Sequence, residues 1–512
     1  MTAQLESAAV RTPARLAALA TASMAVSAAA TWHPVLAVVA GGGLFAAVMG
    51  LMPGTAPPRI VLALTCGLLT GYAFCGRGFA YLGFPPVYVG EIVLVAASLL
   101  SLRAWRACRR LHPSGYVLLI FLAWCAVRTG PGVLDYGLDA LRDAAQWGYA
   151  AFAAIVAATL WRMGAMQPLT RWYSALLTPL LVWYFSIGLL RALRPGFQFP
   201  DGPTGVPWVI VKSGDVAVHL AGVAAFLALR LHKRFASNPA EAWRREWQLW
   251  TLWVSCFLFY GSQNRGGLLG LTVSLLWLAL GLRQGRWGKA AALGLTLIAA
   301  FALLNLEIDL GYERKARPEQ ILENLKSVAG SDNPRMEGTR RWRLEWWRKI
   351  VDYTFQGPYF WTGKGFGPNL ADEDGFQVTR DRSLRSPHNG HLTILARTGV
   401  PGFVLWVGFL LAHGWGLLGA ARRSRLAGET ERSRLLLWTF TYWLAATING
   451  ASDVYLEGPQ GGIWFWCLVG VGQSLLAGTR RSSPPAAWRS APGIEGAGER
   501  DRRTAACWET RS

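Results

Sequence analysis

Charged residues are scarce in this chain: Asp, Glu, Lys and Arg make up 16% of its 512 residues, whereas 52% are hydrophobic. So few charges cannot cover the surface of an ordinary soluble chain of this length, so that class is excluded. Acidic residues are fewer than basic ones: the chain has 30 Asp plus Glu and 51 Lys plus Arg, which gives a net charge of +21. Whether this basic excess indicates nucleic acid depends on where it lies along the chain.

Metal and nucleotide signatures are also missing. The seven cysteines are scattered without a CxxC pair or a Cys-His spacing, so neither a zinc site nor a disulfide framework is predicted. No GxxxxGK[ST] loop occurs, which argues against an ATP-driven pump. These missing signatures therefore predict no cofactor.

Long apolar runs are what the sequence does contain. Windows of about 17 to 22 mostly apolar residues, long enough to cross a bilayer, recur throughout the chain. The first has the basic start and small-residue end of a signal peptide, and we expect an uncleaved helix, with cleavage as the alternative. We predict an all-α polytopic membrane protein with about 12 to 14 transmembrane helices. The windows lie near residues 16–32, 35–52, 60–76, 87–102, 115–128, 145–161, 173–190, 215–231, 248–262, 267–282, 289–306, 390–418, 435–450 and 461–478.

The basic charge is segregated between the two sides of the predicted membrane. If the N-terminus is cytoplasmic, the cytoplasmic segments carry 29 Lys plus Arg, and the short connections on the other side carry 7. The positive-inside rule explains a bias of this size, so no nucleic-acid partner is needed. Two basic cytoplasmic segments are 230–247 and 419–434, and the seven outer residues are Arg77, Arg128, Arg142, Arg191, Arg194, Lys212 and Arg265.

The windows divide the chain into five parts. We expect N-terminal transmembrane helices in 1–195, helices with a periplasmic Lys212/Arg265 edge in 196–306, a large periplasmic loop in 307–387, C-terminal helices in 388–478, and a disordered cytoplasmic tail in 479–512. A loop of that length is expected to be folded and functional.

The middle of the large loop has helical periodicity. In GTRRWRLEWWRKIVDYTF the residues Trp342, Trp346, Ile350 and Tyr353 share one face, with arginines between them. We expect an amphipathic helix at the outer membrane surface, with Trp342, Trp346 and Trp347 as interfacial anchors and stacking on sugars as the alternative.

Several polar residues meet on the outer side at the ends of predicted helices. Arg265 lies in a tight turn, SQNRGG, where its planar fork suits a diphosphate, although binding to lipid headgroups is the alternative. His388 opens the stretch PHNGH, where it is either a functional group or a helix cap. Asn389 can orient a hydroxyl, Arg385 lies three residues before His388, and His391 is expected to be structural.

At this point the residues carry a resemblance. HN followed by nine residues and GxxG (His388, Asn389, Gly399, Gly402) resembles the signature of the bacterial O-antigen ligase and O-antigen polymerase superfamily. SQNRGG at the start of a span, RLEWWRKI followed by GKGFGPN in the large loop, and the position of that loop are similar to the same superfamily over roughly residues 200 to 475.

The resemblance implies an enzyme of the bacterial inner membrane whose active site faces the periplasm. It implies metal-independent, inverting transfer of a glycan from an undecaprenyl-diphosphate donor to a glycan or lipid acceptor, in O-antigen or exopolysaccharide biosynthesis. It assigns His388 as the general base or acceptor-orienting residue, Arg265 to the donor diphosphate and Arg343 to the same clamp, with Arg340 as the alternative to Arg343. Asn389, Arg340, Arg385 and Lys212 are the expected substrate-binding residues.

A transporter of polysaccharide or lipid-linked sugar is the competing interpretation, since many spans and intramembrane charges are expected there too. Its ionisable residues should lie deep in several helices, with symmetry between halves. Here the unusual residues gather at outer helix ends and in one asymmetric loop. We therefore favour the enzyme.

Overall fold

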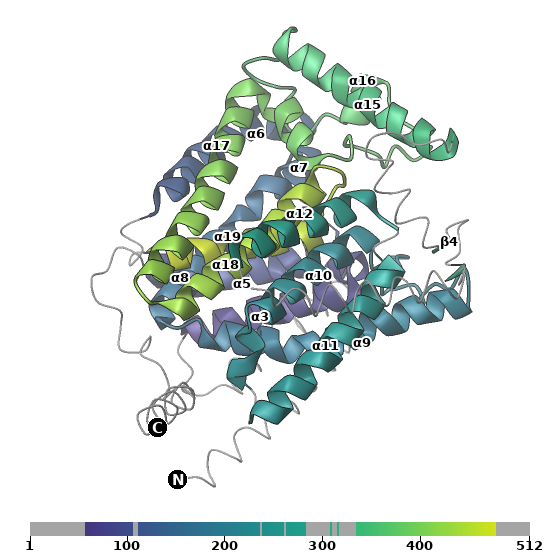
Figure 1. Ribbon diagram of the computed structural model, residues 1–512. Helices are drawn as coiled ribbons and strands as arrows, with labels where there is room; N and C mark the ends of the chain where they lie inside the picture. The colour runs from purple at the N-terminus through teal and green to yellow at the C-terminus, as the bar shows by residue number, and fades with distance from the viewer. Residues whose placement is uncertain are drawn as a thin grey trace, which may run out of the picture.

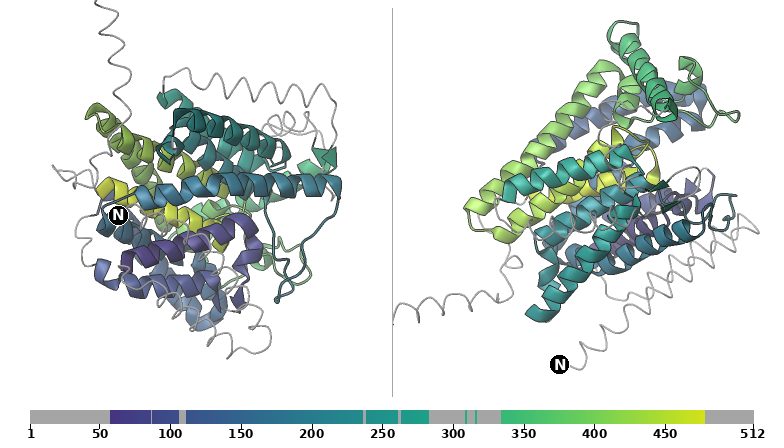
Figure 2. Two further views of the ribbon diagram at one scale, coloured as in Figure 1. Left: turned by 90° about the horizontal axis from the view of Figure 1, so that it is seen from below. Right: turned by 45° about the vertical axis from the view of Figure 1, so that its right-hand side comes forward.

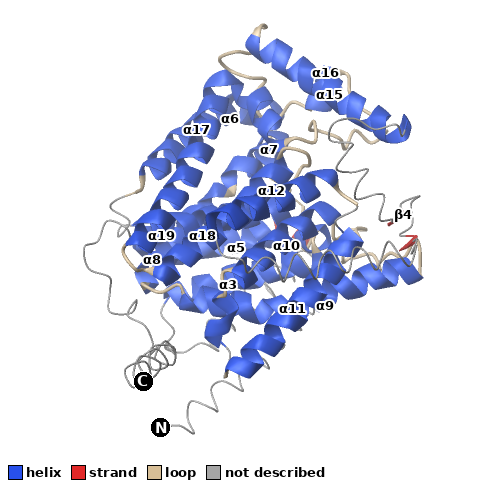
Figure 3. Ribbon diagram, viewed as in Figure 1, coloured by secondary structure: helices blue, strands red, loops and turns tan. Residues whose placement is uncertain are grey.

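Helices form nearly all of the regular structure in the computed structural model, which describes residues 57–85, 87–105, 111–235, 238–260, 263–282, 308–309, 315–316 and 334–477 (Figures 1 and 3). Two small antiparallel sheets, β1–β2 and β3–β4, are the exceptions within these residues. The elements are α3 (Pro57–Cys75), α4 (Arg77–Ala80), β1 (Gly83–Phe84), β2 (Val87–Tyr88), α5 (Val89–Trp105), α6 (Pro113–Tyr136), α7 (Leu138–Gly148), α8 (Ala150–Met163), α9 (Gln167–Leu193), α10 (Ser213–Ala228), the 3₁₀ helix η1 (Leu231–Phe235), α11 (Pro239–Tyr260), α12 (Arg265–Leu282), β3 (Ile308–Asp309), β4 (Lys315–Ala316), α15 (Pro334–Phe355), α16 (Leu370–Asp374), α17 (Gly390–Leu426), α18 (Thr430–Gly450) and α19 (Pro459–Ala477).

The all-α membrane fold predicted from the sequence is confirmed. Within the described ranges, five helical stretches are long and apolar enough to cross a membrane: Pro58–Cys75, Pro113–Tyr136, Leu138–Met163, Gln167–Leu193 and Gly390–Leu426. Every predicted window that falls on described residues overlaps a helix. The windows near 16–32, 35–52 and 289–306, and the tail 479–512, lie outside the described residues.

The core is built around α10, which is buried from Gly214 to Leu227. A helix that is apolar on all sides is expected in such a central position. It packs against α11, α12 and α18, while α18 also contacts α17, and α19 packs on α8 (Figures 1 and 2). Small residues permit these close approaches: a Cβ on Gly470 of α19 would lie 2.6 Å from the carbonyl oxygen of Ala153 in α8.

The basic segments predicted to share one side of the membrane do meet in the structure. Arg234, just beyond α10, forms an ion pair with Glu431 at the start of α18. The Nζ of Lys233 lies 2.6 Å from a carboxylate oxygen of Glu246 near the start of α11. Lys212 precedes the first residue of α10, and Arg265 is the first residue of α12, so both lie at the end of the bundle away from these basic segments. The bundle therefore has one basic end and one end that carries the candidate residues.

The large loop contains the predicted helix, but its aromatic face is covered by protein. α15 lies with α16 at the end of the bundle above α17 (Figure 1). Trp346 and Ile350 are fully buried with residues of α16 and α17, and Trp342 and Tyr353 pack against them. The Nε1 of Trp346 donates to Oδ2 of Asp374 at 2.8 Å. The expectation that Trp346 is an interfacial anchor is therefore wrong, because an amphipathic pattern indicates an apolar face without indicating what covers it.

Candidate functional site

The segment between α18 and α19, residues 451–458, is the point at which the candidate residues converge. The backbone oxygen of Ser452 accepts a hydrogen bond from Nη1 of Arg343 on α15 at 3.1 Å. Oδ1 of Asp453 lies 3.6 Å from Nζ of Lys212, which immediately precedes α10. Two cations from distant parts of the chain thus meet on two consecutive residues.

The start of α12 approaches the same segment. Arg265 is the first residue of that helix, and the side chain of Asn264 accepts a hydrogen bond from the backbone N of Gly267 at 2.7 Å, which caps the helix. A Cβ on Gly266 would lie 1.5 Å from Oγ of Ser452, so only glycine permits this approach. The backbone that carries Arg265 therefore lies beside Ser452.

His388 lies in a strained turn directly before α17. Its φ is +56°, a left-handed conformation that costs a residue with a Cβ about 1–2 kcal/mol. The strain is held by neighbours: Nε1 of Trp347 donates to the carbonyl oxygen of Pro387 at 2.8 Å. Such strain persists only where the surroundings determine the conformation, and it is concentrated at functional sites.

The imidazole of His388 is half-buried, and its Nδ1 is buried without a hydrogen-bond partner. Burial lowers the pKa of His388 to about 4, followed in size by the positive charge of Arg343; Asp453 opposes this shift, and the charge of Lys212 adds a smaller lowering effect. The ring is therefore neutral at neutral pH, the protonation state in which it can accept a proton. The Nε of Arg343 is likewise buried and unpartnered, so a donor and a possible acceptor are both unsatisfied here.

The other residues expected to bind substrate are placed differently. Oδ1 of Asn389 accepts from the backbone N of His391 and of Leu392, each at 3.1 Å, so its side chain caps α17. The guanidinium of Arg385 binds Asp143 through Nε at 3.1 Å and Nη2 at 2.9 Å and does not join the cluster at Ser452. Arg340 belongs to α15, but its side chain lies outside the described residues.

Asp453 was missed by the sequence reasoning, which followed only the cations on the outer side. In the structure its carboxylate pairs with Lys212, and it acts electrostatically on both Arg343 and His388. The available signal was the pair of acidic residues, Asp453 and Glu457, in the short connection NGASDVYLEG between two predicted spans.

Chemically, the cluster offers positive charge beside an uncharged base. Lys212 and Arg343 can hold an anion such as a diphosphate, and the neutral imidazole of His388 can take a proton from a hydroxyl. No group of three or more His, Cys, Asp or Glu side chains is arranged to hold a metal ion within the described parts of the chain.

Comparison with known protein families gives a match. Residues 250–407 match a family model described as O-antigen ligase, and this range includes Arg265, Arg343 and His388. Lys212 and Asp453 lie outside it. No curated protein matches the chain.

Proposed function

We propose that this chain is a glycosyltransferase of the O-antigen ligase superfamily that uses a polyprenyl-diphosphate-linked glycan. The match of residues 250–407 to the O-antigen ligase family supports a membrane enzyme that processes glycans. It transfers or polymerises this glycan, carried on undecaprenyl diphosphate, onto an acceptor hydroxyl at the periplasmic face of the bacterial inner membrane. The observation that carries the proposal is the pair of unsatisfied buried groups, Nε of Arg343 and Nδ1 of His388, at one end of the bundle.

The donor is held by its diphosphate. Arg343 and Arg265 bind the phosphate oxygens, with the planar forks suited to two parallel hydrogen bonds. Lys212 exchanges its ion pair with Asp453 for the same anion. These cations stabilise the negative charge that grows on the leaving diphosphate as the glycosidic bond breaks.

His388 takes the proton of the acceptor hydroxyl. The acceptor oxygen forms a bond to the anomeric carbon while the bond from that carbon to the phosphate oxygen breaks. Attack from the face opposite the diphosphate inverts the anomeric configuration. The proton then passes from the imidazolium to solvent, and the products are the extended or ligated glycan and the polyprenyl diphosphate. No nucleotide is needed, since the leaving group is already a diphosphate.

Donor binding also changes the pKa of His388. In the free site the charges of Arg343 and Lys212 add to burial in lowering the pKa of His388. A diphosphate between those cations offsets their charge and therefore raises the proton affinity of the imidazole. The base thus becomes effective when the donor is in place.

The test compares wild type with His388→Ala in cells from which the chromosomal copy has been removed. An enzyme predicts loss of polymer and accumulation of lipid-linked donor on the periplasmic face, where an impermeant lectin reaches it in spheroplasts. A transporter predicts that the accumulated donor stays on the cytoplasmic face. Lectin labelling only after the spheroplasts are lysed would contradict the enzyme.

A further inference from the structure

One face of α7, a short helix outside the matched range 250–407, is bound to the segment that carries His388. Asp139, Asp143 and Gln146 follow the helical spacing i, i+4, i+7, which places them on that face. The Asp143 side chain is 6% exposed and accepts from three groups. These are Arg385 through Nε and Nη2, Nη2 of Arg397 at 2.9 Å, and the backbone N of Gly367 at 3.1 Å.

The two arginines flank His388 in the sequence. Arg385 lies three residues before it, and Arg397 lies nine residues after it in the first part of α17. Arg397 is 2% exposed, and its Nη1 donates to the carbonyl oxygen of Gly365 at 3.1 Å. One carboxylate therefore fixes both ends of the segment that includes the strained turn.

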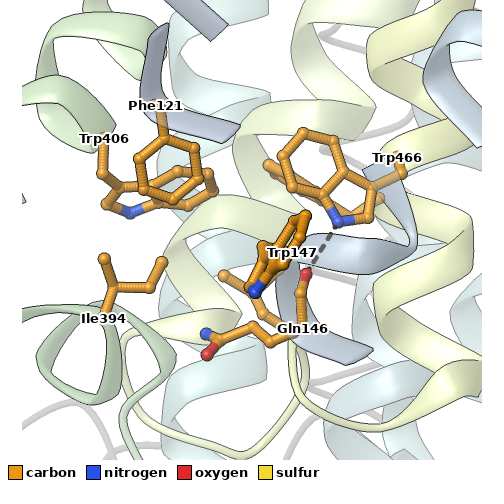
Figure 4. Close-up of a pocket in the computed structure, with 8 residues that line it drawn as sticks. Phe121, Gln146, Trp147, Ile394, Trp406 and Trp466 are labelled. Atoms are coloured by element: carbon orange, nitrogen blue, oxygen red, sulfur yellow. Dashed lines mark hydrogen bonds between the residues drawn. The ribbon is translucent and has the colours of Figure 1, made fainter. Parts of the chain in front are cut away.

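Gln146 adds a contact at the turn itself. Its Nε2 donates to the carbonyl oxygen of Gly390 at 2.9 Å, two residues after His388. Its own backbone oxygen accepts from Nε1 of Trp466 in α19 at 3.0 Å, so α7 is anchored to the bundle on its other side (Figure 4). Gln146, Trp147 and Trp466 line a small aromatic cavity together with Ile394 and Trp406 of α17 (Figure 4).

We propose that Asp143 is a positioning residue of the transferase site, which holds His388 in its productive conformation by binding Arg385 and Arg397. The inference rests on the proposed role of His388. It extends the functional machinery to the N-terminal half of the chain, which the family match does not reach.

A purely stabilising role for Asp143 predicts something different. If the ion pairs only hold the fold together, molecules that remain folded after the charge is removed should keep the native surroundings of His388. If Asp143 positions the turn, loss of its charge removes the carboxylate that Arg397 binds and leaves Arg385 with only the more distant carboxylate of Asp139, and the strained turn relaxes toward solvent. The surroundings of His388 are Arg343 on α15, Lys212 ahead of α10 and Asp453 in the 451–458 segment.

The experiment measures the chemical state of His388 without donor or acceptor. The purified full chain in lipid nanodiscs is treated with diethyl pyrocarbonate, which acylates neutral imidazole, and modification of His388 is followed by peptide mass spectrometry from about pH 3 to 8. In wild type we expect slow modification with a midpoint near the pKa of about 4. In Asp143→Asn we expect faster modification and a midpoint raised by about one unit or more toward the ordinary histidine value.

Two controls accompany this variant. Asp139→Asn makes the same change one turn earlier on α7, at a 52% exposed side chain whose carboxylate lies 3.6 Å from Nη1 of Arg385, and it should leave the midpoint unchanged. His391, in the same peptide, has both ring nitrogens in hydrogen bonds and serves as the unreactive reference. If Asp143→Asn does not reach the membrane, Arg385→Lys, which keeps the charge but loses the two-point contact, replaces it.

Polymer production in cells separates the two hypotheses. A raised midpoint with loss of polymer supports the positioning role. A raised midpoint with normal polymer also supports it, but contradicts the catalytic role proposed for His388. An unchanged midpoint in folded Asp143→Asn, or in Arg385→Lys where that variant takes its place, overturns the positioning role whatever the polymer level.

Discussion

The indole Nε1 of Trp406 donates a hydrogen bond to Nδ1 of His391 at 2.9 Å. The other ring nitrogen, Nε2, donates to the carbonyl oxygen of Thr447 at 2.9 Å, so the tautomer is fixed and both nitrogens are occupied. His388, one turn earlier, has a buried Nδ1 without a partner. The structure thus separates two histidines that the sequence alone leaves equivalent in chemistry, and it assigns His391 to packing.

His388→Ala should therefore abolish product, with a loss of about 10² to 10⁴ in rate, the usual value of general-base assistance. His388→Asn should fail equally, because an amide can hydrogen-bond but cannot take the proton. Product and lipid-linked donor are measured by glycan blot at matched protein levels.

His391→Ala is the control for this pair. It breaks two partly buried hydrogen bonds, so we expect reduced protein abundance with near-normal activity per molecule. A fully active His388→Asn would reduce His388 to a helix cap, for which a loss of only about 0.5–2 kcal/mol of stability is expected.

The pH dependence should differ between the free enzyme and the donor complex. The acid limb of kcat/KM reports the free enzyme, where the pKa of His388 is lowered to about 4, so activity should persist well below the ordinary histidine range and fall as the ring is protonated. The limb of kcat reports the complex, where the diphosphate offsets the cations, and it should lie at higher pH. Coincident limbs would contradict the coupling of donor binding to basicity.

Replacing charges around His388 should move the kcat/KM limb in opposite directions. Arg343→Gln removes a charge that lowers the pKa, so the limb should shift upward; Asp453→Asn removes one that raises it, so the limb should shift downward. Both variants are read from the activity that remains at saturating acceptor. An unmoved limb in both variants would show that burial alone sets this pKa.

Cysteine labelling tests which end of the helical bundle faces the periplasm and which faces the cytoplasm. Val378→Cys, in the large loop, and Ala427→Cys, after α17, are both exposed positions in a background without the seven native cysteines. An impermeant maleimide should label residue 378 in intact cells and residue 427 only after lysis, because the positive-inside rule places 419–434 in the cytoplasm. Labelling of residue 427 in intact cells would place the candidate site on the wrong side.

Features that are local in sequence could be predicted. The spans follow from apolar windows, the helix in the large loop from its periodicity, and the common side of Lys212, Arg265 and His388 from counting alternate connections. The GxxG motif had no assigned structural role, and the structure supplies one for its first glycine. Gly399 has φ +69° at a kink in α17, and a Cβ there would lie 2.5 Å from the carbonyl oxygen of Phe360 in the large loop.

Pairings across long sequence separations could not be predicted. Arg385 appears as one more outer cation until its partner Asp143 is known, 242 residues earlier. A role for Asp453 becomes visible only in the folded chain, where the segment after α18 lies against Lys212 and Arg343. The strained φ of His388 likewise depends on contacts from α15 and α7, which no local propensity encodes.

Arg265→Lys should be nearly as damaging as Arg265→Ala. A diphosphate held by two parallel hydrogen bonds needs the planar fork, whereas an arginine that only reaches lipid headgroups needs a positive charge. A charged hydrogen bond is worth about 1.5–3 kcal/mol, so we expect roughly a 10- to 100-fold loss in kcat/KM for the donor.

Arg343→Lys should cause a similar loss, since the Nε that is unpartnered in the free site has no equivalent in lysine. Arg348→Lys is the matched control, on the same helix as Arg343 with a side chain 85% exposed, and it should retain full activity. If Arg265→Lys is also fully active, Arg265 binds headgroups, and Arg343 and Lys212 alone hold the donor.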